Sequence, residues 1–405
     1  MVGRTISLYR HAYSGLSRST WLLSLVMLVN RSGTMVIPFM TIYLTGPSMG
    51  YSIGQAGLVM GIFGLGAICG GFIGGRFTDR FGFHRVQLVT LTGGGILFMV
   101  LGQMKSLPLI CICTFLLSLV NEAFRPANST AIASYSKEEN RTRSFSLNRL
   151  AINLGWAVGG AIGGILASIN YHLLFWVDGA TNILAMILLR YCLAPITEKH
   201  ASPVKDTAAA AEESPYRDTV YLKFIVFTIL FACCFFQLFT MLPLFYKKAL
   251  HMPEYMIGLL MALNGLIITL FEMVLVFKME GRRENLFYIF NGVALVGLSF
   301  VLLNIFPLSL LLAFLCMLFV TLGEIISMPF MNSFWIARTS AVNRGQYAGL
   351  YTIAWSTANV IGPAGGAQLA EHFGFSTLWW VVGGIGMLSS LGFYRLRQTK
   401  RAVHA

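Results

Sequence analysis

Long apolar runs separated by short polar segments make up most of this chain. About twelve of the runs reach the length of about 20 residues that an α-helix needs to cross a bilayer. None alternates apolar and polar residues with the period of two typical of membrane β-barrels, and lipid cannot hydrogen-bond an exposed backbone. The pattern therefore predicts membrane-spanning helices over residues 21–44, 54–75, 87–104, 108–134, 146–169, 173–193, 222–246, 255–277, 286–305, 308–335, 347–370 and 376–395.

The composition also indicates a membrane protein. Of the 405 residues, 56% are hydrophobic and 11% are charged, and the mean hydropathy is +0.71. A water-soluble protein of this length has too little interior to bury so much apolar surface. The first apolar run is too long for the core of a signal peptide and lacks a cleavage site. We therefore expect an all-α membrane protein that keeps this run as its first span.

Basic residues indicate how the chain is oriented. The formal net charge of +13 would favour a nucleic-acid partner in a soluble domain, but here the bases lie in short loops between apolar runs, so we expect no nucleic acid. The opposite loops hold only Lys105, Lys247 and Lys248. Because basic loops stay on the cytoplasmic side, both termini are expected in the cytoplasm. The bases on that side include Arg4, Arg10, Arg18, Arg76, Arg80, Arg85, Lys137, Arg141, Arg143, Lys199, Lys205, Arg217, Lys278, Arg282, Arg283, Arg338, Arg344, Arg395, Arg397, Lys400 and Arg401.

A polar break divides the predicted spans into two sets of six. It contains Ser202-Pro203, the alanine run 208–211 and Glu212-Glu213-Ser214-Pro215. Polar, proline-containing composition is typical of a linker. We therefore predict an N-terminal six-helix bundle over 1–193, a cytoplasmic linker over 194–221 and a C-terminal six-helix bundle over 222–405.

The two sets of spans are related in sequence. One constant offset carries Asn140-Arg141 onto Asn343-Arg344, and it also carries Pro126, Leu147, Gly159, Gly163 and Trp176 onto Pro329, Leu350, Gly362, Gly366 and Trp379. A slightly shorter offset carries Gly57, Gly64 and Asp79 onto Gly258, Gly265 and Glu280. Two six-helix repeats in the same orientation predict two pseudo-symmetric halves.

A short charged hairpin follows the second predicted span. Its sequence is Gly75-Arg76-Phe77-Thr78-Asp79-Arg80-Phe81-Gly82-Phe83-His84-Arg85. It resembles the signature G-x-x-x-D-R-x-G-x-[RK]-[RK] of the major facilitator superfamily. The resemblance implies the twelve-helix fold of that superfamily, with a substrate path between two six-helix halves and transport by alternating access. It also implies gating roles for Gly75, Asp79, Arg80, Gly82 and Arg85.

The fifth predicted span carries a run of glycines. Gly155-x-x-x-Gly159-Gly160-x-x-Gly163-Gly164 is similar to a motif of the antiporter branch of the superfamily, with Gly160 in place of its proline. Small residues on one helix face permit close packing and bending, so Gly159 and Gly163 form either a gating hinge or a tight contact. Arg149 enters the same span, and we interpret it as a gating residue that pairs with Asp79 or Glu272.

Four charged residues fall near the middle of predicted spans. A charge at that depth costs about 3 kcal/mol or more, so each needs a partner or a water-filled cavity. Glu122 and Arg125 lie three residues apart and therefore on one helix face. In the superfamily the first, fourth, seventh and tenth helices line the central cavity. The resemblance thus implies that Arg31, Glu122, Arg125 and Glu324 share one site.

Our hypothesis makes Glu122 the residue that takes up the coupled proton. Arg31 and Arg125 then set its protonation or bind an anionic group of the substrate. The alternative is a static salt bridge that packs the first helix on the fourth. Glu324 and Glu272 are further candidates for the coupled proton, and Glu272 is equally a candidate latch with Arg338 or Arg344.

Other polar and aromatic residues are predicted to contact the substrate. They are Asn30, Gln237, Asn264, Tyr351 and Trp355. The alternative for the amides is a bridge between helices, and for the aromatic rings a place in the core or against lipid. Asp178, near the outer end of the sixth span, is interpreted as a solvated acid at a helix end.

The cysteine and histidine patterns argue against an enzyme or a metal protein. All seven cysteines lie in apolar stretches at spacings that fit no metal site, so we expect seven small buried hydrophobes. The seven histidines are scattered over loops and termini, and neither a catalytic motif nor a phosphate-binding loop is present. We expect no enzymatic activity and no cofactor, with a proton gradient as the energy source.

The sequence thus predicts a proton-coupled secondary transporter in a bacterial inner membrane. Its resemblance to drug:proton antiporters implies export of amphipathic small molecules. Paired arginines in the cavity favour the alternative, proton-coupled uptake of a small polar or anionic solute such as a peptide or an organic acid. The R-x-x-x-G-x-G signature of drug antiporters has Thr114 at the place of its arginine, so the choice stays open. The expected partners are a small-molecule substrate, protons and lipid, and the expected state is a monomer.

Overall fold

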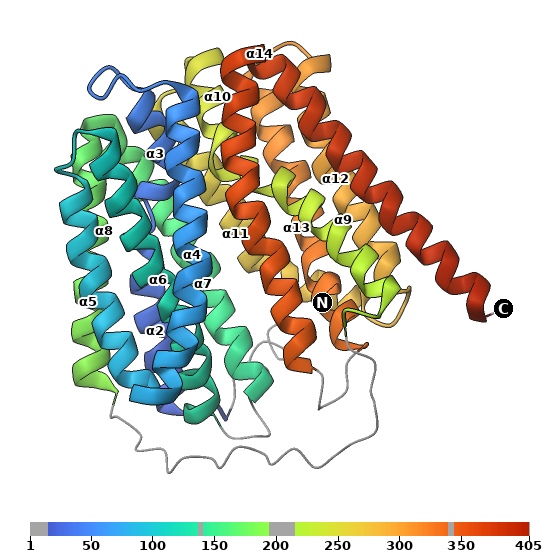
Figure 1. Cartoon of the computed structure of the whole chain (residues 1–405), viewed down its shortest axis with the longest axis horizontal. Coiled ribbons are helices and arrows are strands. Elements are labelled where there is room, and N and C mark those ends of the chain that lie inside the picture. Colours follow the sequence, from blue (N-terminus) through green and yellow to red (C-terminus); the bar gives the residue numbers. More distant parts are fainter. Residues whose placement is uncertain (1–14, 137–140, 194–214, 339–343, 405) are drawn as a thin grey trace, which may run out of the picture. The chain divides into compact units, whose positions relative to one another are not determined.

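The computed structural model describes residues 15–136, 141–193, 215–338 and 344–404, which are almost entirely helical (Figure 1). These residues form two compact units. The first contains the chain up to Val36 and residues 66–193, and the second contains residues 37–65 and the chain from 215 onwards. The predicted division into bundles with a linker over 194–221 stays a prediction, and residues 194–214 lie outside the described residues.

Six helical segments of the described chain build the first unit. Small residues bring two of them together, since a Cβ atom at Gly66 would lie 2.5 Å from the carbonyl oxygen of Phe115, and one at Gly74 would lie 2.5 Å from the Cα atom of Ala123. Glycines on one face permit such close helix contacts in membranes. The segments are α2 (Arg18–Ser32), the second half of α4 (Ile53–Phe81), α5 (Phe83–Leu101), α6 (Leu107–Tyr135), α7 (Arg141–Ile169) and α8 (Tyr171–Cys192).

The second unit contains the first half of α4 and the helices of the second repeat. The front of α4 packs on the last helix through glycines, because a Cβ atom at Gly64 would lie 2.7 Å from the carbonyl oxygen of Asn359. The other elements are α3 (Val36–Thr45), α9 (Thr219–Phe235), the 3-10 turn η2 (Phe236–Phe239), α10 (Met241–Ala249), α11 (Glu254–Met279), α12 (Asn285–Ile305), α13 (Leu310–Ile336) and α14 (Arg344–His404).

The helices confirm the twelve predicted spans. Eleven helical stretches of the described chain are long and apolar enough to cross a membrane. The last of them, Gln346–Thr399, holds two of the predicted spans, and Figure 1 shows α14 as two rods joined by a turn. The turn is at Gly374, whose φ of 82° and ψ of 167° suit glycine and few other residues.

The first and seventh spans are each interrupted, which the sequence analysis did not predict. α2 ends at Ser32 and a new helix begins at Val36, while α9 passes through η2 and resumes at Met241. In both cases a proline, Pro38 or Pro243, is the third residue of the new helix. Proline has no N–H, and its ring clashes with the carbonyl four residues earlier, so a continuous helix is disfavoured at both places.

Many large apolar side chains remain on the outside of the helices. Phe72, Val89 and Phe277, for example, are between 61% and 72% exposed. In water such a surface would be unfavourable, but lipid is as apolar as these side chains. The exposed surface therefore fits a protein embedded in a bilayer.

The expectation that all seven cysteines are buried is wrong for four of them. Cys113, Cys234 and Cys316 are buried. Cys69, Cys111 and Cys233 are half-buried, and Cys192 is exposed. An apolar run does not show which face of a helix turns towards lipid, and Cys192 is the last residue of α8.

Candidate functional site

Three of the predicted site residues come together in the first unit. The Nε atom of Arg125 lies 3.1 Å from the Oε2 atom of Glu122, one turn away on α6. Both residues also act electrostatically on the guanidinium of Arg31 in α2. One carboxylate and two guanidinium groups thus form a cluster with a formal charge of about +1, which we call the Glu122 cluster.

The two arginines of the Glu122 cluster have different surroundings. The side chain of Arg125 is 70% exposed and that of Glu122 is 17% exposed. The Nε atom of Arg31 is buried, and no group in the described residues accepts a hydrogen bond from it. A buried donor without an acceptor costs about 1–3 kcal/mol. The cluster therefore has one cation that a ligand can reach and one whose hydrogen bonding is incomplete.

Glycines of α7 determine how closely Arg31 approaches that helix. A Cβ atom at Gly155 would lie 2.6 Å from the Cβ atom of Arg31, and one at Gly159 would lie 3.0 Å from the carbonyl oxygen of Ser32. Gly163 is buried further along the same helix. The glycine run therefore forms a tight contact with α2, and its predicted role as a hinge stays a prediction.

The second unit brings together another pair of predicted site residues. The Nδ2 atom of Asn264 in α11 donates to Thr321 Oγ1 at 3.0 Å and to Glu324 Oε2 at 3.4 Å, both on α13. Glu324 is half-buried, so it is a carboxylate with a hydrogen-bond donor beside it. Because Glu324 and the Glu122 cluster belong to different units, their sharing one site stays a prediction.

Gln237, Tyr351 and Trp355 lie within the second unit. Gln237 Nε2 donates to the carbonyl oxygen of Gly362 at 2.8 Å, so this amide bridges η2 and α14. The Trp355 ring makes edge contacts with three phenylalanines, at centroid distances of 5.9–6.1 Å, and a further one with Tyr351 at 6.3 Å. The Trp355 Nε1 atom is buried and has no hydrogen-bond partner in the described chain. Contact of these residues with a substrate stays a prediction.

The charged hairpin between α4 and α5 is exposed. α4 extends to Phe81, Gly82 turns the chain with a φ of 82°, and α5 begins at the next residue. Asp79, Arg80 and Arg85 are all exposed. The interpretation of Arg149 as a gating residue that pairs with Asp79 or Glu272 stays a prediction. The Cβ direction of Gly75 is open, and the gating roles of the hairpin stay predictions.

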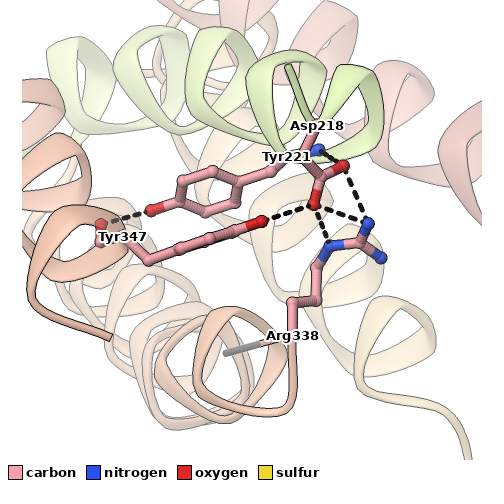
Figure 2. Close-up of polar contacts among 4 residues, drawn as sticks. All are labelled: Asp218, Tyr221, Arg338 and Tyr347. Carbon is pink, nitrogen blue, oxygen red and sulfur yellow. Dashed lines mark hydrogen bonds and ion pairs between the residues drawn. The ribbon is translucent and has the colours of Figure 1, made fainter. Parts of the chain in front are cut away.

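Of the two candidate latch partners of Glu272, Arg344 stays a prediction and Arg338 has another partner. It pairs with Asp218 rather than with Glu272, which is buried on α11. Figure 2 shows the guanidinium fork of Arg338 meeting the carboxylate of Asp218. Its Nε and Nη2 atoms each lie 2.8 Å from a carboxylate oxygen. The Tyr347 hydroxyl adds a third donor at 3.1 Å.

Asp218 also caps α9, because it accepts the backbone N–H of Tyr221 at 3.0 Å. Burial acts to raise the pKa of Asp218, but the Tyr221 N–H, the Arg338 guanidinium and the Tyr347 hydroxyl outweigh it and lower that pKa below its ordinary value. In the predicted division of the chain, Asp218 falls in the linker over 194–221. An acidic residue directly before an apolar run is a helix-start signal that would have identified the cap.

Asp178 is not the solvated helix-end acid that the sequence analysis expected. It is fully buried in α8. Its carboxylate accepts the backbone N–H groups of Met35 and Val36, at 2.8–3.1 Å. These are the amides at the break in the first span, and no sequence pattern links them to a residue so distant in the chain.

Comparison with known proteins identifies the family. Residues 20–363 match the sequence model of the Major Facilitator Superfamily. The chain belongs to this superfamily. It is therefore a multi-pass membrane transporter, and the expectation that it is not an enzyme is confirmed.

Individual relatives are distant. The chain is 25% identical to the "Na(+), Li(+), K(+)/H(+) antiporter" of Planococcus maritimus, over 89% of this chain and 91% of that protein. It is 22% identical to the "Tetracycline resistance protein, class D" of Salmonella ordonez, over 76% of this chain and 77% of that protein. A crystal structure of a POT family transporter in complex with 5-aminolevulinic acid superposes with a TM-score of 0.77 at 15% identity, over 94% and 96% of the two chains. This last likeness shows the fold alone.

Proposed function

We propose that this transporter exchanges protons for amphipathic small molecules, which it exports from the cytoplasm by alternating access. The observation that carries the proposal is the Glu122 cluster. Among the described residues of the first unit, Glu122 is a carboxylate within a membrane span that pairs with a cation of its own helix. Relatives named as cation/proton and drug-resistance proteins support proton exchange as the mode of transport.

In this mechanism proton and substrate compete for Glu122. The deprotonated carboxylate pairs with Arg125 at 3.1 Å and attracts a cationic substrate group. Protonation removes the negative charge, so the substrate loses its counter-ion and leaves, while Arg125 loses its partner. Arg31 remains close enough to act electrostatically on both residues. Two states of one carboxyl group thereby couple two opposite fluxes.

A second candidate is proton-coupled uptake of a small anionic solute such as a peptide or an organic acid. The incomplete hydrogen bonding of Arg31 and the exposure of Arg125 favour it. A substrate carboxylate would bind these guanidinium groups by charge-assisted hydrogen bonds, which are the strong ones in a low dielectric. Glu122 would then be protonated when the anion binds, so that proton and solute travel together.

We further propose where the transporter lies in the cell and that it works as a single chain. The positive charge of one set of loops and the bacterial relatives support a bacterial inner membrane, with both termini in the cytoplasm. We propose a monomer as the working unit, because each half supplies its own polar groups. Glu324 with Asn264, and the buried Glu272, are the candidates for a second proton-carrying group in the second unit.

Proton exchange by the purified protein tests the proposal. A pH-sensitive dye in weakly buffered detergent solution would report protons as ethidium, dialanine, succinate, sodium or potassium is added. Proton release on adding ethidium, lost in Glu122→Gln, is the result expected for export by antiport. Proton uptake on adding dialanine or succinate would establish the second candidate instead, and release by the inorganic ions alone would contradict an amphipathic substrate.

The control is a matched change of a carboxyl group to an amide outside the cluster. Glu254→Gln removes an acid that pairs with Lys247 at 2.8 Å at the start of α11. It should leave the proton exchange unchanged. An equal loss in both variants would show that the effect comes from general damage to the protein.

A further inference from the structure

The break in the first span is held by one face of α8. Asp178, Thr181 and Asn182 lie on that face at the spacing of one helical turn. The Asn182 Oδ1 atom accepts from Asn30 Nδ2 at 2.9 Å, before the break. At the break itself, Gly33 packs directly on Thr181, with the position of its missing Cβ atom 3.4 Å from the Cα atom of Asp178.

Asp178 provides the acceptors that the new helix start needs. The Met35 N–H donates to both carboxylate oxygens, at 3.1 and 3.0 Å, and the Val36 N–H donates to Oδ2 at 2.8 Å. Helix starts leave such N–H groups without partners, and in lipid no water can replace the missing acceptor. Pro38 has no N–H, so it removes one more unpaired donor from the first turn.

No cation of the described residues balances the charge of Asp178. It is fully buried and forms no ion pair with any side chain in the described part of the chain. Burial opposes the negative charge, whereas the N–H groups and the positive end of the helix dipole favour it. The basic groups with described side chains on α8 and on the helices packed against it are Arg18 and Arg31 of α2, His84 and Arg85 of α5, Arg143 and Arg149 of α7, and His172 and Arg190 of α8.

We infer that Asp178 is a second proton-binding site, and that its protonation releases the break between α2 and α3. A carboxylate offers only acceptors to the two amides. A protonated carboxyl is a weaker acceptor. It also carries an O–H donor, and the N–H groups at a helix start offer this O–H no acceptor. Proton binding therefore weakens the hydrogen bonds at the start of α3 and lets the Met35 and Val36 N–H groups open more often.

A change at the break also affects the Glu122 cluster, because Arg31 belongs to that cluster and lies next to the break in the sequence. Arg31 lies two residues before Gly33, so any change at the break moves the guanidinium that acts on Glu122 and Arg125. The inference goes beyond the proposed function, because Asp178 binds its proton whether or not Glu122 does. The sixth span thus has its own proton-binding residue, and proton binding there changes the conformation of the break between α2 and α3.

Two measurements on the full-length protein in lipid nanodiscs test the inference. Infrared difference spectra between acid and alkaline buffer should show a protonated carboxyl band from Asp178, absent in Asp178→Asn and retained in Glu122→Gln. Hydrogen exchange of the peptide that covers residues 33–45, corrected for the intrinsic effect of pH, should be at least about tenfold slower in alkaline buffer, because charge-assisted hydrogen bonds are about twice as strong. In Asp178→Asn the exchange should be fast at both pH values.

The controls separate proton binding from packing. Asn182→Ala removes a polar contact to the same break without removing a titrating group, so it should leave the carboxyl band in place. If Asp178→Asn does not fold, isotope-labelled aspartate in the wild-type protein assigns the band to one of only four aspartates, Asp79, Asp178, Asp206 and Asp218. A spectrum without a titrating aspartate band, or exchange of the 33–45 peptide that is independent of pH, would overturn the inference. Loss of coupling in Glu122→Gln with the Asp178 band unchanged would separate the two proton sites.

Discussion

The ion pair between Asp218 and Arg338 should contribute measurably to the stability of the second unit. The change to make is Asp218→Asn, because asparagine keeps an acceptor for the Tyr221 N–H and removes only the charge. Arg338 is then left with a neutral partner in a site where the Asp218 side chain is 6% exposed and the Arg338 side chain 25% exposed. Arg338→Gln removes the opposite charge of the same pair.

The magnitude follows from the burial of the pair. Breaking a fully buried pair costs about 3–5 kcal/mol, whereas an exposed pair is worth about 0–1 kcal/mol. With one partner a quarter exposed and four donor atoms on the carboxylate, we expect a coupling energy of about 2 kcal/mol between the two residues. Tyr347→Phe, which removes one hydrogen bond to a charged group, should cost about 1.5 kcal/mol.

The assay is a double-mutant cycle on reversible unfolding in mixed detergent micelles. Glu284 and Arg397 provide a control pair in the same unit, with Arg397 Nε 2.9 Å from Glu284 Oε2 and a Glu284 side chain that is 44% exposed. Their cycle should give less than about 1 kcal/mol. A coupling energy for Asp218 and Arg338 no larger than that of the control pair would refute the argument from burial.

The same pair should show a defined dependence on pH. The pKa of Asp218 is lowered in the folded protein, so its contribution is fully present above the unfolded pKa of about 3.9 and is lost as the pH falls through the folded value. The difference between wild type and Asp218→Asn should therefore stay constant from about pH 5 to pH 8. A difference that changes across this neutral range would contradict the assignment.

Two further predictions concern glycines that permit close helix contacts. Gly323→Ala should destabilise the second unit by about 1–3 kcal/mol, because its Cβ atom would lie 2.6 Å from the carbonyl oxygen of Gly292, whereas Gly349→Ala, with open space in that direction, should be nearly neutral in the same unfolding assay. Gly33→Ala should lower the yield of folded protein because its methyl group overlaps Thr181, and Thr181→Gly in the same chain should restore much of that yield. An equal effect of the two alanine variants in α13 and α14, or no rescue by Thr181→Gly, would contradict the packing.

Sequence periodicity was sufficient to predict the spans, since lipid requires long apolar helices with internal hydrogen bonds. It was also sufficient for the pair Glu122–Arg125, because residues three apart on a helix must face the same side. Predicting that Arg31 lies near this pair also required the family resemblance, which assigns the first and fourth helices to one cavity. These features could be predicted because they depend on residues close together in the sequence or on the known fold of the superfamily.

Contacts between distant segments were beyond the sequence. Nothing near Asp178 in the chain indicates that it caps a helix start at Met35 and Val36, because that contact depends on a break in another span. Pro38 and Pro243 were visible signals for both breaks, yet Pro126 and Pro329 lie inside unbroken helices. Proline alone therefore does not locate a break. Partner choice at Arg338 also depended on geometry, since both Asp218 and Glu272 are acids of the same unit.

Transport driven by an imposed proton gradient tests the central claim most directly. Protein reconstituted in liposomes would be given a gradient of pH, and the uphill movement of ethidium would be followed by fluorescence for wild type, Glu122→Gln and the control Glu254→Gln. We expect Glu122→Gln to lose uphill movement, because its neutral amide neither binds the coupled proton nor attracts the cationic group of ethidium, and we expect the control to match wild type. Uphill movement at the wild-type level in Glu122→Gln would contradict the assignment of the coupled proton to Glu122.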